Sequence, residues 1–205
     1  MSKLSLYNGA LRICGERRLA SLSENREPRR LLDDIWDDNA IKACLEQGQW
    51  VFATRAVQLD YSPSVEPPFG YQYAFDLPTD FIRTVALCSD PYFQSPLLQY
   101  SQEAGFIFCD LQTIYFKYVS DDNAYGMDMS MWPETFVKFV QAFLAKELAP
   151  RLKNGADQDK IEKEYKAART ESLARDAMES PTKFPPPGSW VQARRRGSWQ
   201  DRNRT

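Results

Sequence analysis

The stretch PETFVKFVQAFLAKEL, residues 133–148, decides how the rest of this sequence is interpreted. Its large apolar residues recur at intervals of three or four, namely Phe136, Val140, Phe143 or Leu144, and Leu148. That interval places them on one face of an α-helix, and Pro150 marks where the helix has to end. The stretch therefore predicts a strongly amphipathic helix, and it follows a long section with a different pattern.

That preceding section, from residue 56 onward, consists of short aromatic and β-branched runs separated by Pro, Gly and Asp, which is typical of strands. Six strands are predicted, at residues 56–61, 72–76, 82–88, 97–101, 105–109 and 113–119. Gly105 accepts the positive φ that a tight loop needs, so residues 103–105 are predicted to form a hairpin tip.

Two helical patterns lie on the N-terminal side of the strands. The first covers residues 4–15 and ends at Gly15, a residue suited to capping a helix C-terminus; its apolar face consists of Leu4, Tyr7, Leu11 and Cys14. The second begins at Pro28, which suits the first turn of a helix, and keeps helical spacing up to Gly48. One helix is therefore predicted over residues 28–48.

The polar face of this second helix is charged, and its members are Arg29, Arg30, Asp33, Asp34, Asp37 and Asp38. Asp33 and Asp37 stand one turn apart and could orient a glycan or a metal ion. Because arginines flank these carboxylates, we expect ion pairs within the helix instead.

Beyond residue 148 the sequence predicts one more helix, at residues 157–177, with only a thin apolar stripe. From residue 180 proline and arginine dominate, and such a segment is expected to be extended. The order of elements predicts an α+β fold: a helical bundle with an inserted antiparallel β module and an extended C-terminal arm. The expected segments are residues 1–55, 56–120, 121–180 and 181–205, which are respectively N-terminal helices, β module, C-terminal helices and arm.

Charge is distributed unevenly along the 205 residues, although the net charge is only −2. Residues 181–205 carry six basic side chains and one acidic one, whereas the other 180 residues carry 20 basic and 27 acidic ones. An acidic body, net −7, is thus joined to a cationic arm, net +5.

Membrane insertion and secretion are not expected from this sequence. Its apolar runs reach at most four residues, against about 20 for a membrane helix. Asn8, Gly9 and Arg12 interrupt any signal-like segment, so the default compartment is the cytoplasm. The four cysteines have neither zinc-site nor disulfide-framework spacing and are expected to be buried thiols.

Catalytic signatures are not found. The chain contains no histidine, no phosphate-binding loop and no GxGxxG motif, so no cofactor site and no enzymatic activity are predicted. Asp121, Asn123 and Gly126 match three positions of a calcium loop, but Tyr125 and Trp132 occupy positions where side-chain ligands are needed. We therefore expect a tight polar loop without a metal.

The arm has three interpretations: a solubilising tail, a nucleic-acid arm or a docking peptide. Its distinctive residues are Pro185, Pro186, Pro187, Trp190, Arg194, Arg195, Arg196 and Trp199. Tryptophan and arginine stack on bases, but they also dominate the hot spots of protein interfaces. Among the three interpretations we favour docking on a protein partner.

Several local patterns resemble, in their order along the chain, the tail tubular protein A family of short-tailed bacteriophages and the related head-to-tail adaptor proteins. They are Leu6-Tyr7-Asn8 with Ala10-Leu11 and Gly15-Glu16, Trp50-x-Phe52-Ala53-x-Arg55, Phe75-x-Leu77-Pro78-x-Asp80-Phe81-Ile82-Arg83, and Pro133-x-x-Phe136 leading to Leu144-Ala145. These motifs are mostly apolar and none is catalytic, so the resemblance lies in the series, which covers residues 4 to about 152.

The resemblance implies a virion structural protein that forms a dodecameric ring below the portal. The implied partners are the portal, the tail nozzle and other copies of the chain, with genomic DNA passing through the lumen without specific binding. An acidic body agrees with such a channel, because it repels the phosphate backbone. Portal docking is expected of the arm, which could span at most about 80 Å.

Two other classes remain open. A DNA-binding packaging or regulatory factor would use the arm to bind phosphates, and a glycan hydrolase would use paired carboxylates. Salt-dependent DNA affinity would favour the former, and cleavage of peptidoglycan would favour the latter.

Overall fold

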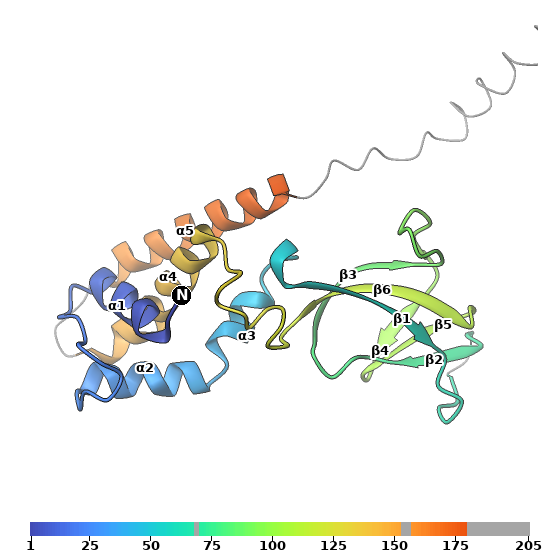
Figure 1. The fold of residues 1–205 in the computed structure, drawn as a ribbon, viewed down its shortest axis with the longest axis horizontal. Helices are drawn as coiled ribbons and strands as arrows, with labels where there is room; N and C mark the ends of the chain where they lie inside the picture. The colour runs from blue at the N-terminus through green and yellow to red at the C-terminus, as the bar shows by residue number, and fades with distance from the viewer. Residues whose placement is uncertain (68–69, 153–156, 180–205) are drawn as a thin grey trace, which may run out of the picture.

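The computed structural model of the chain describes residues 1–67, 70–152 and 157–179. It has an α+β fold, as predicted, with a helical part and a β part side by side (Figure 1). The arm predicted at residues 181–205 lies outside the described residues.

The helical part is built from both ends of the sequence. It contains α1 (Lys3–Ile13), α2 (Glu27–Asp37), α3 (Ala40–Leu45), α4 (Glu134–Leu148) and α5 (Gln158–Glu179). All of them contact α4, the helix of the stretch that decides the fold. Because neighbours cover α4 on several sides, its buried residues extend beyond a single face and include Val137, Phe139 and Ala142.

The end of α1 follows from its sequence. Gly15 has a φ of 75°, the left-handed conformation that glycine adopts most easily. This conformation brings the N–H of Glu16 to the carbonyl of Leu11 at 2.8 Å and the N–H of Gly15 to that of Arg12 at 3.2 Å. Both bonds belong to a Schellman motif, so the predicted glycine cap is confirmed.

The single helix predicted over residues 28–48 is wrong, because the structure divides it into α2 and α3. Asn39 lies between them with a φ of 63°, which a right-handed α-helix does not allow. Apolar periodicity continues across the break, but Asp37, Asp38 and Asn39 are poor helix formers and asparagine tolerates the left-handed region. Local propensity therefore outweighs periodicity here.

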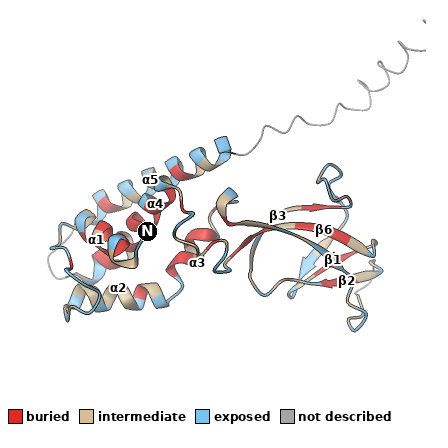
Figure 2. Cartoon of the chain, viewed as in Figure 1, coloured by how far each residue is buried: buried red, intermediate tan, exposed pale blue. Residues whose placement is uncertain are grey.

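Helix α5 has the thin buried stripe that its sequence predicts. Ile161 and Ser172 are buried, Tyr165 and Leu173 are half-buried, and most other side chains of the helix face solvent (Figure 2). No helix within the described ranges is long and apolar enough to cross a membrane.

The β part consists of two antiparallel sheets of three strands each. One has the order β1 (Thr54–Asp60), β6 (Thr113–Ser120), β3 (Phe81–Cys88), and the other has the order β2 (Tyr73–Asp76), β5 (Phe106–Cys109), β4 (Ser101–Glu103). Alternate residues of β6, Ile114, Phe116 and Tyr118, are fully buried in a core shared with Phe75 and Ile107 of the other sheet. Val119, on the opposite face of β6, belongs to the core of the helical part.

The fourth predicted strand is displaced. The sequence predicts a strand at residues 97–101, but β4 comprises Ser101–Glu103, and an isolated bridge between Cys88 and Pro96 precedes it. Pro96 has no N–H to donate to a ladder, and Leu98 is 87% exposed. The hairpin tip is confirmed, since Ala104 and Gly105 both have positive φ, 50° and 85°.

Candidate functional site

The side chains predicted to dock on a partner all lie outside the described residues; they are Pro185, Pro186, Pro187, Trp190, Arg194, Arg195, Arg196 and Trp199. Within the described part, polar side chains gather at the junction between the helical part and the β part. This junction is the candidate site.

Asp80, just before β3, is the centre of the junction. Its carboxylate forms an ion pair with Arg55 of β1, with Nη1 and Oδ2 3.0 Å apart. It also accepts hydrogen bonds from the hydroxyl of Tyr118, at 2.9 Å, and from the hydroxyl of Ser120. The guanidinium of Arg55 in turn lies 5.4 Å from the ring centroid of Tyr125. One carboxylate thus joins β1, β6 and the start of β3.

Hydrogen bonding keeps Asp80 ionised. Burial raises the pKa of this carboxyl, but the bonds from Ser120, Tyr118 and Arg55 outweigh burial and hold the pKa below its usual value. Burial and the bond to Asp80 raise the pKa of Tyr118, so this phenol stays protonated. The network therefore consists of one ionised carboxylate and three side-chain donors, which are placed around it by β1 and β6.

Three further contacts cross the junction. Lys42 of α3 pairs with Asp121 after β6 at 3.3 Å, and Arg83 of β3 donates from Nη1 to the carbonyl of Glu46 at 3.1 Å. At the C-terminal end of α5, Asp176 accepts the N–H of Val51 at 2.9 Å. Helices from both ends of the chain are therefore bonded to this junction.

An aromatic cluster lies beside these polar contacts. The ring of Phe136 at the start of α4 has its centroid 4.8 Å from those of Trp50 and Phe52 and 5.1 Å from that of Trp132. Trp50 is 1% exposed and donates from Nε1 to the carbonyl of Leu45 at 3.1 Å. Aromatic rings packed in this way, with the indole N–H of Trp50 bonded, stabilise this boundary.

The motifs behind the family resemblance have structural roles. Arg55 of one motif pairs with Asp80 of the next, and Phe52 of the first of these motifs packs on Phe136 of a third. In the first motif, Asn8 bonds to both the N–H and the carbonyl of Leu19, at 2.7 and 3.1 Å. Each motif therefore fixes one segment of the chain against another.

Of the ion pairs expected within α2, the structure shows one, between Arg29 and Asp33, whereas Asp34, Asp37 and Asp38 form no ion pair with the described residues. Asp33 pairs with Arg29 one turn earlier, and also with Lys3 of α1 at 3.3 Å. It accepts a hydrogen bond from Tyr7 at 2.9 Å as well. Asp33 is thereby used to attach α1 to α2.

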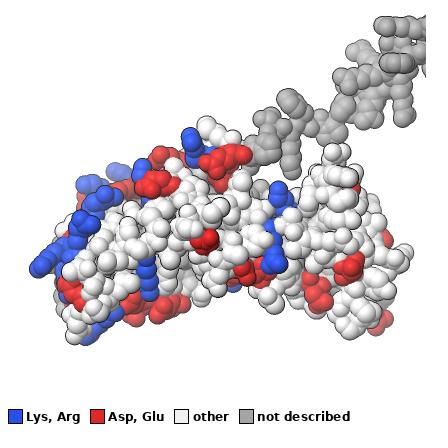
Figure 3. Space-filling model, in the orientation of Figure 1, with Lys and Arg blue, Asp and Glu red and all other residues white. Residues whose placement is uncertain are grey.

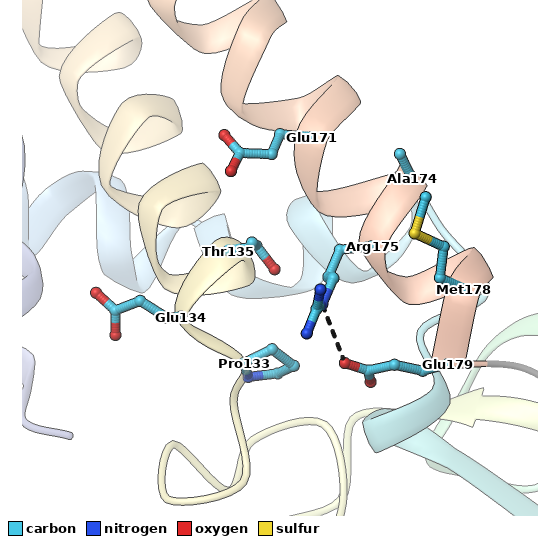
Figure 4. Close-up of a pocket in the computed structure, with 8 residues that line it drawn as sticks. All are labelled: Pro133, Glu134, Thr135, Glu171, Ala174, Arg175, Met178 and Glu179. Carbon is cyan, nitrogen blue, oxygen red and sulfur yellow. Dashed lines mark ion pairs between the residues drawn. The ribbon is translucent and has the colours of Figure 1, made fainter.

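Two grooves flank the junction. One, of about 580 Å³, lies between the first turn of α4 and the last turns of α5 and contains Glu134, Glu171 and the pair Arg175–Glu179 (Figure 4). The other, which we call the neck groove, has a volume of about 710 Å³. The neck groove is lined by residues that include Val51, Thr54, Arg83, Lys117, Leu173 and Asp176.

The cysteines of the chain have the surroundings of structural thiols. Burial raises the pKa of Cys14 to about 11 and also raises the pKa values of Cys44 and Cys109, so these thiols are protonated at neutral pH. Three cysteines are buried as predicted, whereas Cys14 is half-buried. In the described ranges, no cluster of three or more cysteines and carboxylates is arranged to hold a metal ion.

The loop that resembles a calcium site is closed by its own hydrogen bonds, one of which runs from the N–H of Gly126 to the carbonyl of Ser120 at 3.1 Å. The carboxylate of Asp122, which is not one of the three matched positions, accepts a hydrogen bond from the N–H of Ala124 at 2.8 Å. Gly126 approaches the chain so closely that a Cβ there would lie 2.2 Å from the carbonyl oxygen of Ser120. Glycine is required at this position by the close contact.

Sequence reasoning did not identify four of the residues that form the junction and the neck groove, namely Asp80, Arg83, Lys117 and Asp176. Asp80 and Arg83 belong to a motif quoted for the resemblance, which is the one signal that could have drawn attention to them. Their partners are 25 or more residues away in the chain, and no local pattern identifies such pairs.

Comparison of the chain with known proteins found no family model and no curated protein that matches it.

Proposed function

We propose that the protein is a virion structural protein, a head-to-tail adaptor that forms a ring between the portal and the tail nozzle and extends the DNA channel. In this proposal the ring is a dodecamer, as the resembled family implies, and the protein is located in the neck of the virion after assembly in the host cytoplasm. The proposed role is architectural and not enzymatic.

The observation that carries this proposal is the composition of the junction. The motif that contains Trp50, Phe52 and Arg55 contacts two others: Arg55 pairs with Asp80 just before β3, and the rings of Trp50 and Phe52 pack on Phe136 of α4. Contacts between segments are the role expected of a series of apolar, non-catalytic motifs, and an adaptor needs such contacts to keep its two parts in a fixed relation.

Charge supports the proposed passage of DNA. The first 180 residues carry a net charge of −7, so a lumen built from this body gains nothing by counterion release from DNA phosphates. A channel that does not hold the backbone lets the genome pass.

Attachment to the portal is assigned to the arm. Trp190 and Trp199 would fill apolar clefts of the portal, while Arg194, Arg195 and Arg196 pair with its carboxylates. Pro185, Pro186 and Pro187 favour an extended chain, which lowers the entropy lost on docking.

Sedimentation of the full chain with its cognate portal tests the proposal. We expect portal particles to gain the mass of a complete ring of copies. A chain that remains monomeric at micromolar concentration, both alone and in the presence of portal particles, would refute it.

A further inference from the structure

The neck groove contains two cations without a carboxylate partner. Arg83 lies opposite Val119 in the β3–β6 ladder, and Lys117 is two residues from Val119 on the same face of β6. Arg83 donates to a backbone carbonyl, and the ammonium of Lys117 lies 5.9 Å from the ring centroid of Phe93. Neither forms an ion pair within the described part of the chain, and the nearby carboxylate of Asp176 is bonded to Val51.

This arrangement favours an anionic occupant. Like charges on one face of a sheet repel each other, and the repulsion is relieved when a carboxylate is placed between them. Val51 and Leu173 add apolar surface at the groove, where Val51 is 41% exposed.

The same chain carries a surface that matches this groove. Asp34, Asp37 and Asp38 are exposed on α2 and at its C-cap, and we call these three residues the acidic edge. Among the described residues, the ion pairs of the aspartates of α2 all involve Asp33, and no Lys or Arg pairs with the acidic edge.

The two surfaces lie on opposite sides of the molecule. In Figure 1, α2 runs along the lower edge of the helical part, while α5, whose last turns line the neck groove, runs along the upper edge. Figure 3 shows acidic side chains along the lower edge, acidic and basic ones along the upper edge, and basic side chains at the neck. Different surfaces on opposite sides are what a head-to-tail contact needs, and such contacts form a ring when the rotation from copy to copy closes.

We propose that the neck groove of one copy binds the acidic edge of the next copy, and that this is the lateral contact of the ring. The inference rests on the proposed function, because it names the surfaces through which the copies meet. Arg83 and Lys117 on one copy pair with Asp34 and Asp37 on its neighbour.

Charge exchange in the full chain tests this contact. We expect Arg83→Glu with Lys117→Glu to weaken ring formation on portal particles about tenfold or more, because carboxylates then face carboxylates. Asp34→Lys with Asp37→Lys should do the same. The four substitutions together restore opposite charges across every contact and should return assembly to within about threefold of the original chain.

Two controls distinguish loss of the contact between copies from effects on folding and on net charge. Arg17→Glu with Arg18→Glu makes the same charge change at two exposed residues outside both surfaces and should leave assembly unchanged. Circular dichroism and thermal unfolding of each variant check that the fold is intact, and only variants with an unchanged midpoint are compared. Should a reversal variant unfold, Lys117→Gln and Asp37→Asn replace it, each with an expected loss of about threefold.

The outcomes are distinct. If the original chain forms no ring on the portal, the proposed function fails and this inference with it. If the original chain and both reversal variants assemble equally well, the ring stands and the contact proposed here is overturned. Loss in each pair without recovery in the fourfold variant also overturns it, because the two surfaces then meet other partners.

Discussion

Replacing Asp80 tests whether the hydrogen bonds to its carboxylate stabilise the junction. In Asp80→Ala, the hydroxyls of Tyr118 and Ser120 and the guanidinium of Arg55 lose their common acceptor. The side chain of Asp80 is 12% exposed and that of Arg55 is 37% exposed, so water replaces only part of what is lost.

The magnitude follows from these contacts. A hydrogen bond to a charged group contributes about 1.5–3 kcal/mol when buried, whereas the half-exposed arginine pair contributes about 1 kcal/mol or less. Contacts that share one acceptor are not additive, so we expect a total loss of about 3 kcal/mol in the free energy of unfolding. For a chain of this size that lowers the thermal midpoint by roughly 6–12 °C.

The pH dependence has a definite sign. Since the folded-state pKa of Asp80 is lowered, its contribution is complete above the ordinary aspartate pKa of about 3.9 and is lost as pH falls through the lower folded value. The difference in stability between the original chain and Asp80→Asn should therefore be constant above about pH 5 and shrink in stronger acid.

Thermal and urea unfolding, followed by circular dichroism and tryptophan fluorescence at several pH values, measure both effects. Asp76→Asn is the matched control, because Asp76 is an exposed carboxylate at the end of β2 and should change stability by less than about 0.5 kcal/mol. A midpoint for Asp80→Ala equal to that of the control would show that the network does not hold the junction, and the reasoning would be wrong.

Three other predictions concern packing, docking and DNA. Gly126→Ala should cost about 1–3 kcal/mol in thermal unfolding, because the new methyl group meets the carbonyl of Ser120; an unchanged midpoint would contradict the close contact. Deleting residues 181–205 should leave the body folded but abolish attachment to DNA-filled heads, and Trp190→Ala should weaken portal binding about thirtyfold, against about fivefold or less for Arg194→Ala. Normal docking of the truncated chain would remove the arm as the anchor. The same truncated chain should give no sequence-specific shift of duplex DNA at about 0.15 M salt, and specific retention in a mobility-shift assay would oppose the channel.

Element types could be predicted from the sequence wherever local rules dominate. The intervals of α4, the glycine after α1 and the turn at Ala104 and Gly105 each depend on residues close together in the chain. The break at Asn39 was missed because apolar periodicity continues through it, although the run of Asp and Asn contained the signal.

Pairings between distant segments could not be predicted. Asp80 and Arg55 are conspicuous charges beside apolar motifs, but their ion pair depends on the register of β1, β6 and β3, which a single sequence does not determine. The neck groove likewise depends on α5 lying against the 3-10 turn that precedes β1. Charge totals describe the body as acidic but do not reveal two unpaired cations in one groove.

Imaging the purified full chain by electron microscopy, alone and on its cognate portal, tests the central claim most directly. The account predicts closed rings of twelve copies with a central hole, coaxial with the portal, in at least the portal-bound sample. Portal particles that carry no added ring, together with isolated single copies in the free sample, would contradict it.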